Sequence, residues 1–306
     1  MLHATLPGIH SPPDPRDGTL TGSPTASGVQ VGVAQISVDR TDVAANVERV
    51  IETLRAGAAG GHQLVVFPEC VLTGYLFDSR AETRAAAIGA ADPRIGRIVR
   101  ACAETSVHAV VGLLEEADGR VYNSALVLGP SGIIGRYRKQ HLPYLGADRF
   151  VDPGADAAPR VADTPFGRVG VMICFDLRFP ESARELALQG ADLIAMPTNW
   201  PMGSDMLADH MTRVRALENL VYLAVADRAD AEAGTRFMGR SQIIAPSGEV
   251  LADAGQDEGL FGASIDVRAA RTKRLIKKPG EFELPVFAGR RPEMYGELTR
   301  PMASGQ

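Results

Sequence analysis

The chain alternates short, almost wholly apolar runs with longer segments whose apolar residues recur at helical spacing. Runs rich in valine, isoleucine and leucine that stop at glycine or proline are typical of strands buried on both faces. This pattern predicts strands over residues 29–36, 63–69, 108–116, 121–129, 132–139, 168–176, 191–198, 221–227, 241–253 and 260–267. Helical spacing with capping residues predicts helices over 42–59, 93–105, 180–190 and 204–220.

Strands that alternate with helices indicate sheets covered by helices. The stretches 108–138 and 239–266 are rich in hairpin strands, which favours two mixed sheets packed face to face over one parallel sheet. We expect one α/β domain over residues 29–280. Residues 1–28, rich in proline, glycine, serine and threonine, are interpreted as a flexible N-terminal tail. Residues 281–306 are interpreted as an irregular C-terminal arm that lies at a subunit interface.

Composition narrows the class of protein. With 306 residues, 45% of them hydrophobic, the chain has an ordinary globular composition. A net charge of -5 and the lack of basic runs interleaved with aromatic residues argue against nucleic acid as a partner. No uncharged apolar run approaches the roughly 20 residues that span a bilayer. Three cysteines make a disulfide framework improbable, so we expect a soluble, cytoplasmic protein without membrane partners.

Three reactive side chains follow predicted strands: Glu69, Lys139 and Cys174. Ligand sites in α/β proteins gather beyond the carboxyl ends of strands. A thiol at a strand-to-helix turn is placed for nucleophilic attack, a buried carboxylate for proton transfer and a lysine for charge stabilisation. Each residue alone has a simpler interpretation: a core cysteine, an exposed loop glutamate and a solvated lysine.

Five motifs occur together in a fixed order. They are FPE (67–69), GRYRKQHLP (135–143), CFDLRFPE (174–181), PTNWP (197–201) and GTRFMGRSQIIAPSG (234–248). In these motifs the chain resembles the nitrilase superfamily of carbon-nitrogen hydrolases. The resemblance implies a four-layer αββα sandwich with two mixed sheets, a homodimer or higher homo-oligomer, and no metal or organic cofactor. It also implies a catalytic set formed by Glu69, Lys139 and Cys174, with the backbone N–H of Phe175 at the oxyanion.

The implied reaction is hydrolysis of a small non-peptide amide through a cysteine thioester, with release of ammonia or an amine. N-carbamoyl compounds and nitriles are alternative substrates for the same site, and a catalytically silent scaffold or binding protein is the alternative that is not an enzyme. Many relatives carry a second glutamate after the HLP-like segment. Here the nearest carboxylate is that of Asp148, which either replaces this glutamate or caps a turn.

Residues near the three strand ends are candidates for substrate binding: Tyr75, Tyr144, Asp148, Arg178, Asn199 and Trp200. Each has an alternative role. Arg178 could pair with a glutamate of the following helix, and Trp200 could be packed at an interface. The six histidines show no metal-ligand spacing, and His210 is interpreted as a core residue on an apolar helix face.

Overall fold

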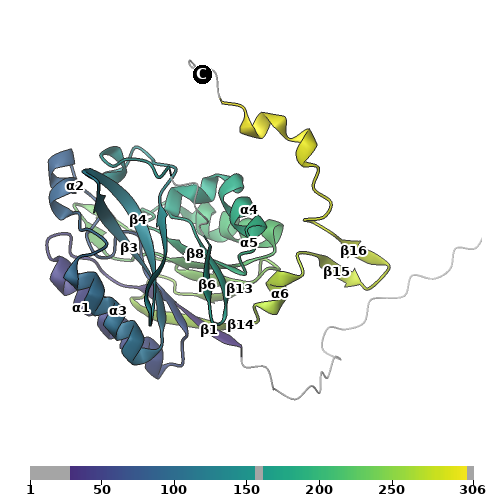
Figure 1. Cartoon of the computed structure of the whole chain (residues 1–306), viewed down its shortest axis with the longest axis horizontal. Helices are drawn as coiled ribbons and strands as arrows, with labels where there is room; N and C mark the ends of the chain where they lie inside the picture. The colour runs from purple at the N-terminus through teal and green to yellow at the C-terminus, as the bar shows by residue number, and fades with distance from the viewer. Residues whose placement is uncertain (1–27, 156–160, 302–306) are drawn as a thin grey trace, which may run out of the picture.

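Two six-stranded mixed sheets pack face to face in the computed structural model, which describes residues 28–155 and 161–301 (Figure 1). The first sheet has the strand order β14 (Gly259–Ile265), β1 (Val29–Gln35), β2 (Leu64–Val66), β3 (His108–Ala117), β4 (Arg120–Gly129) and β5 (Gly132–Arg138). The second has the order β13 (Val250–Asp253), β12 (Gln242–Ile244), β9 (Tyr222–Ala226), β8 (Leu193–Pro197), β7 (Gly167–Val171) and β6 (Val161–Thr164). In each sheet three parallel strands are flanked by antiparallel ones.

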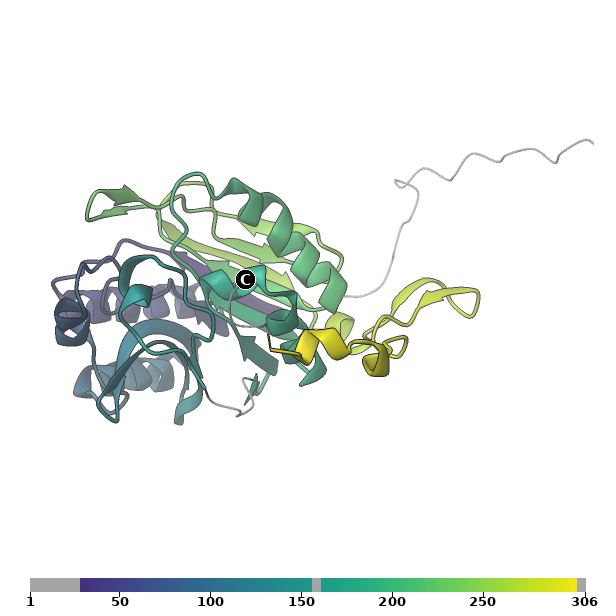
Figure 2. The same ribbon diagram turned by 90° about the horizontal axis from the view of Figure 1, so that it is seen from above.

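Helices cover the outer face of each sheet, as the view from above shows (Figure 2). The first sheet is covered by α1 (Val43–Ala59) and α3 (Pro93–Thr105), and the second by α4 (Pro180–Leu188) and α5 (Thr212–Asn219). The αββα sandwich with two mixed sheets that the sequence implied is therefore confirmed. Two short helices, α2 (Arg80–Ala86) and α6 (Arg268–Arg271), and two ribbons, β10 (Ala231–Glu232) with β11 (Thr235–Arg236) and β15 (Leu275–Lys278) with β16 (Phe282–Leu284), complete the elements.

Three apolar layers separate the four structural layers. One lies between the sheets and contains Val33 of β1, Val171 of β7 and Ala224 of β9. The other two lie between each sheet and its own helices. Because each central strand contributes to two of these layers, its sequence is apolar on both faces, which explains the continuous apolar runs.

Local signals fix the ends of the helices. The Asp42 side chain accepts a hydrogen bond from the N–H of Ala45 at the start of α1, and Asp92 accepts one from Arg94 at the start of α3. Proline occupies the first position of α3 and of α4, where its missing N–H costs nothing. Two predicted strands end early, at Val66 and at Val171, and the residues that follow carry the candidate site.

The helix predicted over 204–220 shows several of its large apolar residues to solvent. A π-helical turn, Leu207–Met211, precedes α5, and the inward face consists of Leu207, Ala208, Thr212, Arg215, Ala216 and Asn219. Met206, Val214 and Leu217 are exposed. His210 is also exposed, so its interpretation as a core residue was wrong. Most of the inward residues are small or polar, which lets the helix lie close to the sheet.

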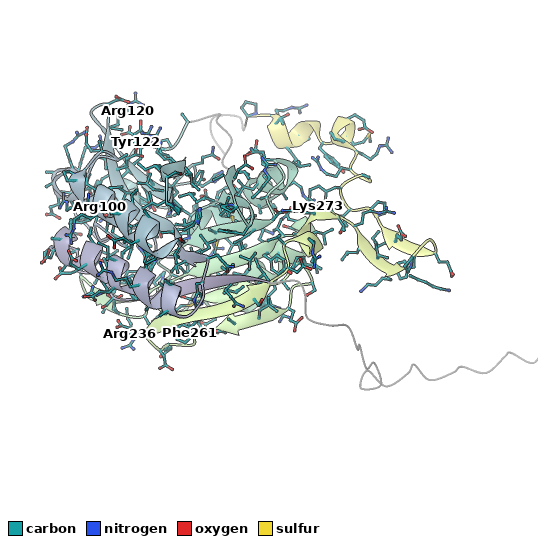
Figure 3. All side chains as sticks on the ribbon, turned by 60° about the horizontal axis from the view of Figure 1, so that its bottom comes forward. Arg100, Arg120, Tyr122, Arg236, Phe261 and Lys273 are labelled. Atoms are coloured by element: carbon teal, nitrogen blue, oxygen red, sulfur yellow. The ribbon has the colours of Figure 1, made fainter. Side chains whose placement is uncertain are left out.

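The C-terminal segment leaves the sandwich after α6, at Lys273, which Figure 3 labels. The β15–β16 ribbon projects from the body in Figures 1 and 2. The chain then forms short 3-10 turns at Pro292–Met294 and Gly296–Thr299. Phe287 packs against the α4 layer, under the guanidinium of Arg184.

Residues 1–27 of the predicted tail and 302–306 of the predicted arm lie outside the described residues, and the predicted domain limits stay a prediction.

No helix among the described residues is both long enough and apolar enough to cross a membrane.

Candidate active site

Glu69, Lys139 and Cys174 follow the ends of three strands, and the charges of Glu69 and Lys139 both act on the Cys174 thiol. Strands β2 and β5 run in the same direction, because β2 is parallel to β3 and β4 is antiparallel to both β3 and β5. Glu69 and Lys139 follow these strands within a few residues, and Lys139 Nζ lies 2.7 Å from Glu69 Oε1. Cys174 follows β7 of the facing sheet. The carboxylate and the ammonium are fully buried, whereas the cysteine is half-buried.

Asp148 also contacts the lysine. It lies in the 3-10 turn Gly146–Arg149, is buried, and its Oδ2 is 2.6 Å from Lys139 Nζ. The amide of Asn123 on β4 donates to Glu69 Oε1 at 2.7 Å and to Asp148 Oδ1 at 2.9 Å. One ammonium and one amide therefore bridge two carboxylates, which offsets the cost of burying both of them.

Glu69 uses its two oxygens differently. Oε1 accepts hydrogen bonds from Lys139 and Asn123, whereas Oε2 is buried and has no hydrogen-bond partner among the described residues. A buried carboxylate oxygen without a donor is costly and calls for an explanation, such as a proton or a substrate group that it meets during the reaction. This oxygen is the free acceptor of the cluster.

Tyr75 supports the cluster from behind Asp148. Its hydroxyl donates to Asp148 Oδ2 at 2.8 Å and its ring is fully buried. Burial and the Asp148 carboxylate raise the pKa of Tyr75 well above its usual value, so the hydroxyl stays a donor. The backbone N–H groups of Tyr75 and Leu76 donate to Glu232, whose second oxygen binds the buried Arg228.

The cysteine begins a tight turn. Cys174 has a φ of 44° and is the first residue of the 3-10 helix Cys174–Arg178. A non-glycine residue in this left-handed region is strained, and such strain is common at functional sites. The first N–H groups of a helix have no partner within it. The Asp176 N–H already donates to the Ile173 carbonyl, so the Phe175 N–H is the one that an oxyanion could use.

Charges and burial set the protonation states. Burial alone would lower the pKa of Lys139, but the carboxylates of Asp148 and Glu69 raise that pKa well above its ordinary value. Burial raises the pKa of Glu69, as does Asp148, while Lys139 opposes the rise. Burial and the Glu69 carboxylate also raise the pKa of Cys174, against the opposing effects of Lys139, the Thr198 hydroxyl and the Asn199 backbone N–H. A raised pKa favours the neutral thiol over the thiolate at Cys174.

The other predicted residues occupy different environments. Asn199 is buried, and its amide donates to the Glu69 carbonyl at 2.9 Å, while its Oδ1 has no hydrogen-bond partner among the described residues. Trp200 is buried in the same apolar cluster that the half-buried Cys174 contacts. Tyr144 is 91% exposed on the loop between Lys139 and Asp148. Arg178 is exposed and is the last residue of the 3-10 helix that begins at Cys174.

Sequence reasoning missed Asn123 and Asp176. Both are buried polar residues within or beside apolar runs, YNSALVLG and MICFD, and that polarity was the available signal. Asp176 accepts hydrogen bonds from the Ile173 N–H and the Tyr137 hydroxyl. Within residues 28–155 and 161–301, no group of three His, Cys, Asp or Glu side chains is arranged to hold a metal ion.

Comparisons with known proteins identify the family of the chain. The carbon-nitrogen hydrolase family profile matches residues 30–274. A protein named nitrilase from Pyrococcus abyssi is 40% identical over 269 residues, which cover 87% of this chain and 99% of that protein. The human omega-amidase NIT2 is 32% identical over 286 residues, 87% of this chain and 96% of that one.

Solved structures share the fold. A carbon-nitrogen hydrolase from Helicobacter pylori G27 superposes with a TM-score of 0.79 at 23% identity, covering 90% of this chain and 99% of the other. The amidase from Nesterenkonia sp. AN1, in a mutant form with an acetamide group bound covalently to its active-site cysteine, gives a TM-score of 0.77 at 21% identity, covering 90% and 98%. The chain thus belongs to the carbon-nitrogen hydrolase family of the nitrilase superfamily and is an enzyme of that class.

Proposed function

We propose that the enzyme hydrolyses a small non-peptide amide through a thioester on Cys174. Glu69 is the proton-transfer group, and Lys139 stabilises the charge that develops on the substrate oxygen. The observation that carries the proposal is the difference between the two oxygens of the Glu69 carboxylate. Oε1 accepts hydrogen bonds from Lys139 and Asn123, whereas Oε2 has no hydrogen-bond partner among the described residues. A carboxylate held by one oxygen and free at the other is suited to moving a proton.

The first half-reaction forms the thioester. Glu69 takes the proton of the Cys174 thiol, and the sulfur bonds to the amide carbon. The electron pair of the carbonyl moves to oxygen, where the Lys139 ammonium and the Phe175 backbone N–H stabilise the negative charge. Glu69 then gives its proton to the leaving nitrogen, the carbon-nitrogen bond breaks, and ammonia or an amine departs.

The second half-reaction regenerates the enzyme. Water attacks the thioester carbon while Glu69 takes a proton from the water, and the carbon-sulfur bond then breaks. The departing thiolate takes the proton back from Glu69, and a carboxylic acid is released. The raised pKa of Glu69 suits this repeated exchange, because a carboxyl group with a raised pKa gives up its proton less readily and is the better base.

Asp148 is proposed as the carboxylate that orients Lys139. Its oxygens accept hydrogen bonds from Lys139, Tyr75 and Asn123, so they are less available for proton transfer than Glu69 Oε2. In this arrangement Asp148 takes the place of the second glutamate of many relatives, and the shorter side chain reaches the lysine from the 3-10 turn. Asn199 and Trp200 are proposed to line the acyl side of the site, and Tyr144 and Arg178 its outer rim.

Turnover of a substrate panel tests the proposal. The wild-type enzyme is expected to release ammonia from at least one small primary amide, and Cys174→Ala is expected to release none. Mass spectrometry of the quenched wild-type reaction should find an acyl group on the peptide that contains Cys174. N-carbamoyl amines and nitriles in the panel separate the alternative substrates, and failure of every compound would refute the substrate assignment.

We also propose that a second copy of the chain covers the outer face of α4 and α5. This face exposes large apolar side chains at Leu188, Met206, Val214 and Leu217. Along α4 it continues into the C-terminal arm, where the exposed Leu298 lines a cavity of about 370 Å³ between α4 and the arm and Met294 is also exposed. Contiguous exposed apolar side chains mark interaction surfaces, and a homo-oligomer is the usual way to bury them.

A further inference from the structure

One buried carboxylate joins the turn that carries Cys174 to the strand end that carries Lys139. Asp176 is fully buried and lies two residues after the cysteine. Its Oδ2 accepts the Tyr137 hydroxyl at 2.7 Å and the Ile173 N–H at 2.9 Å. Its Oδ1 lies 2.7 Å from His141 Nδ1 and 3.3 Å from the His141 backbone N–H.

These partners lie on both sides of Lys139 and directly before Cys174 in the sequence. Tyr137 and His141 lie two residues before and two residues after Lys139, so residues on both sides of the lysine hydrogen-bond to the same carboxylate. Ile173 directly precedes Cys174, so its N–H fixes the entry to the strained turn. Asp176 itself donates its backbone N–H to the Ile173 carbonyl at 2.9 Å, which closes that turn.

The histidine makes a second contact with the same turn. Its ring stacks on Phe179, the residue that ends the 3-10 helix, with centroids 3.7 Å apart and planes 11° apart. Phe179 in turn meets Phe175 edge-on at 5.4 Å. His141 is therefore held between Asp176 and Phe179, and the loop after Lys139 cannot shift without moving the turn that carries the nucleophile.

From this geometry we propose that Asp176, acting through Tyr137 and His141, is a positioning residue that sets the distance between the Cys174 thiol and the Lys139 ammonium. The proposal rests on the proposed function of these two residues. Asp176 does not face the reacting atoms, because its oxygens are taken by Tyr137, His141 and the backbone. Its effect is therefore on the alignment of the site, where displacements of about 1 Å can change rates about 100-fold.

The test removes the side-chain hydrogen bonds to Asp176 one at a time. Tyr137→Phe and His141→Ala are each expected to lower kcat about 10-fold with little change in KM, because the substrate contacts persist while the alignment loosens. Both should slow alkylation of Cys174 by iodoacetamide, a probe that needs no substrate. Since Tyr137 and His141 hydrogen-bond to the same carboxylate, the fold-loss of kcat in the double variant should be smaller than the product of the two single fold-losses. His141→Asn, which keeps a donor at the position of Nδ1, should recover part of the rate.

A matched control separates alignment from stability. Tyr222 is also a buried tyrosine between the two sheets, and its hydroxyl accepts a hydrogen bond from the Asp266 N–H, away from the site. Tyr222→Phe is expected to lower the melting temperature while kcat and the alkylation rate stay within about 2-fold of wild type.

Two results would overturn the proposal in distinguishable ways. If wild-type Cys174 reacts with iodoacetamide well ahead of Cys70 and Cys102 while Tyr137→Phe and His141→Ala keep wild-type rates, Asp176 has only a structural role. If wild-type Cys174 reacts no faster than the two buried cysteines, the proposed function fails as well. The harsher Asp176→Asn variant, expected to lose about 100-fold in kcat, is informative where its melting curve shows a folded protein.

Discussion

The hydroxyl of Tyr75 donates a 2.8 Å hydrogen bond to Oδ2 of Asp148, the same oxygen that contacts Lys139 Nζ. Tyr75 is held in place by Glu232, which accepts its backbone N–H at 2.9 Å, and Glu232 is bound by the buried Arg228. A segment 157 residues downstream therefore supports the tyrosine that contacts the carboxylate beside the lysine. The tyrosine acts on the lysine through Asp148.

Tyr75→Phe is expected to lower kcat about 10-fold. A hydrogen bond to a charged group contributes about 1.5 to 3 kcal/mol, and here its loss leaves Asp148 less firmly oriented toward the ammonium. Steady-state kinetics on an accepted amide measure the effect. Tyr122→Phe is the control, since this buried tyrosine of β4 lies under the Arg138 guanidinium at 4.0 Å, outside the catalytic cluster. Equal kinetics for the two variants would contradict the role of Tyr75.

The acidic limb of the pH profile should reflect Glu69. The carboxylate must be ionised to accept the thiol proton, so activity is lost as the pH falls through its pKa. Because burial raises the pKa of Glu69, this limb of kcat/KM should lie above the value of about 4.3 for an unperturbed glutamate. A limb at or below that value would show that Glu69 is not the base.

Asn123→Ala should move this limb to still higher pH. The Asn123 amide donates to Glu69 and lowers the pKa of the carboxyl, so removing the donor lets the pKa rise further. Asn219→Ala is the matched control: this asparagine is buried on α5, its amide donates to the Arg215 carbonyl, and its loss should reduce stability without moving the limb. The measurement is the pH profile of kcat/KM for both variants. An acidic limb that moves no further in Asn123→Ala than in Asn219→Ala would contradict the prediction.

The fold could be predicted from the sequence, and the three reactive residues could be proposed from it, because both inferences rest on local patterns. Glu69, Lys139 and Cys174 each follow a strand and lie in one of the motifs on which the resemblance to the family was based. Asn123 and Asp176 were not found, because their roles arise only when distant segments converge on their polar atoms. The outward face of α5 was missed for a different reason: the helix packs inward with alanine, threonine and asparagine and leaves its larger apolar residues outside.

That exposed face predicts the oligomeric state. Light scattering at micromolar concentration is expected to give at least twice the monomer mass, and Val214→Lys is expected to shift the protein toward the monomer. Val214 is half exposed in the single chain, so the charge should disturb an interface more than the fold. Ile133→Lys, at a similarly exposed apolar residue on β5, should leave the mass unchanged. A monomeric wild-type protein would exclude the proposed interface.

Asp148 gives the sharpest test of how the lysine is held. Asp148→Asn removes the carboxylate that most strongly raises the pKa of Lys139 and leaves the Tyr75 hydroxyl and the ammonium facing a neutral amide. We expect kcat to fall by about 100-fold, the lower range for loss of a group that organises oxyanion stabilisation.

Asp148→Glu keeps the charge but adds a methylene where the aspartate oxygens already lie 2.6 to 2.9 Å from Lys139, Tyr75 and Asn123. Overpacking should displace the lysine, so we expect a smaller loss, about 10-fold, with the melting temperature lowered. Asp163→Asn, at an exposed residue of β6 paired with Arg168, is the control for loss of a carboxylate. If Asp148→Asn kept more than about a third of wild-type kcat, well above the loss expected for such a group, then Glu69 alone would suffice to orient Lys139.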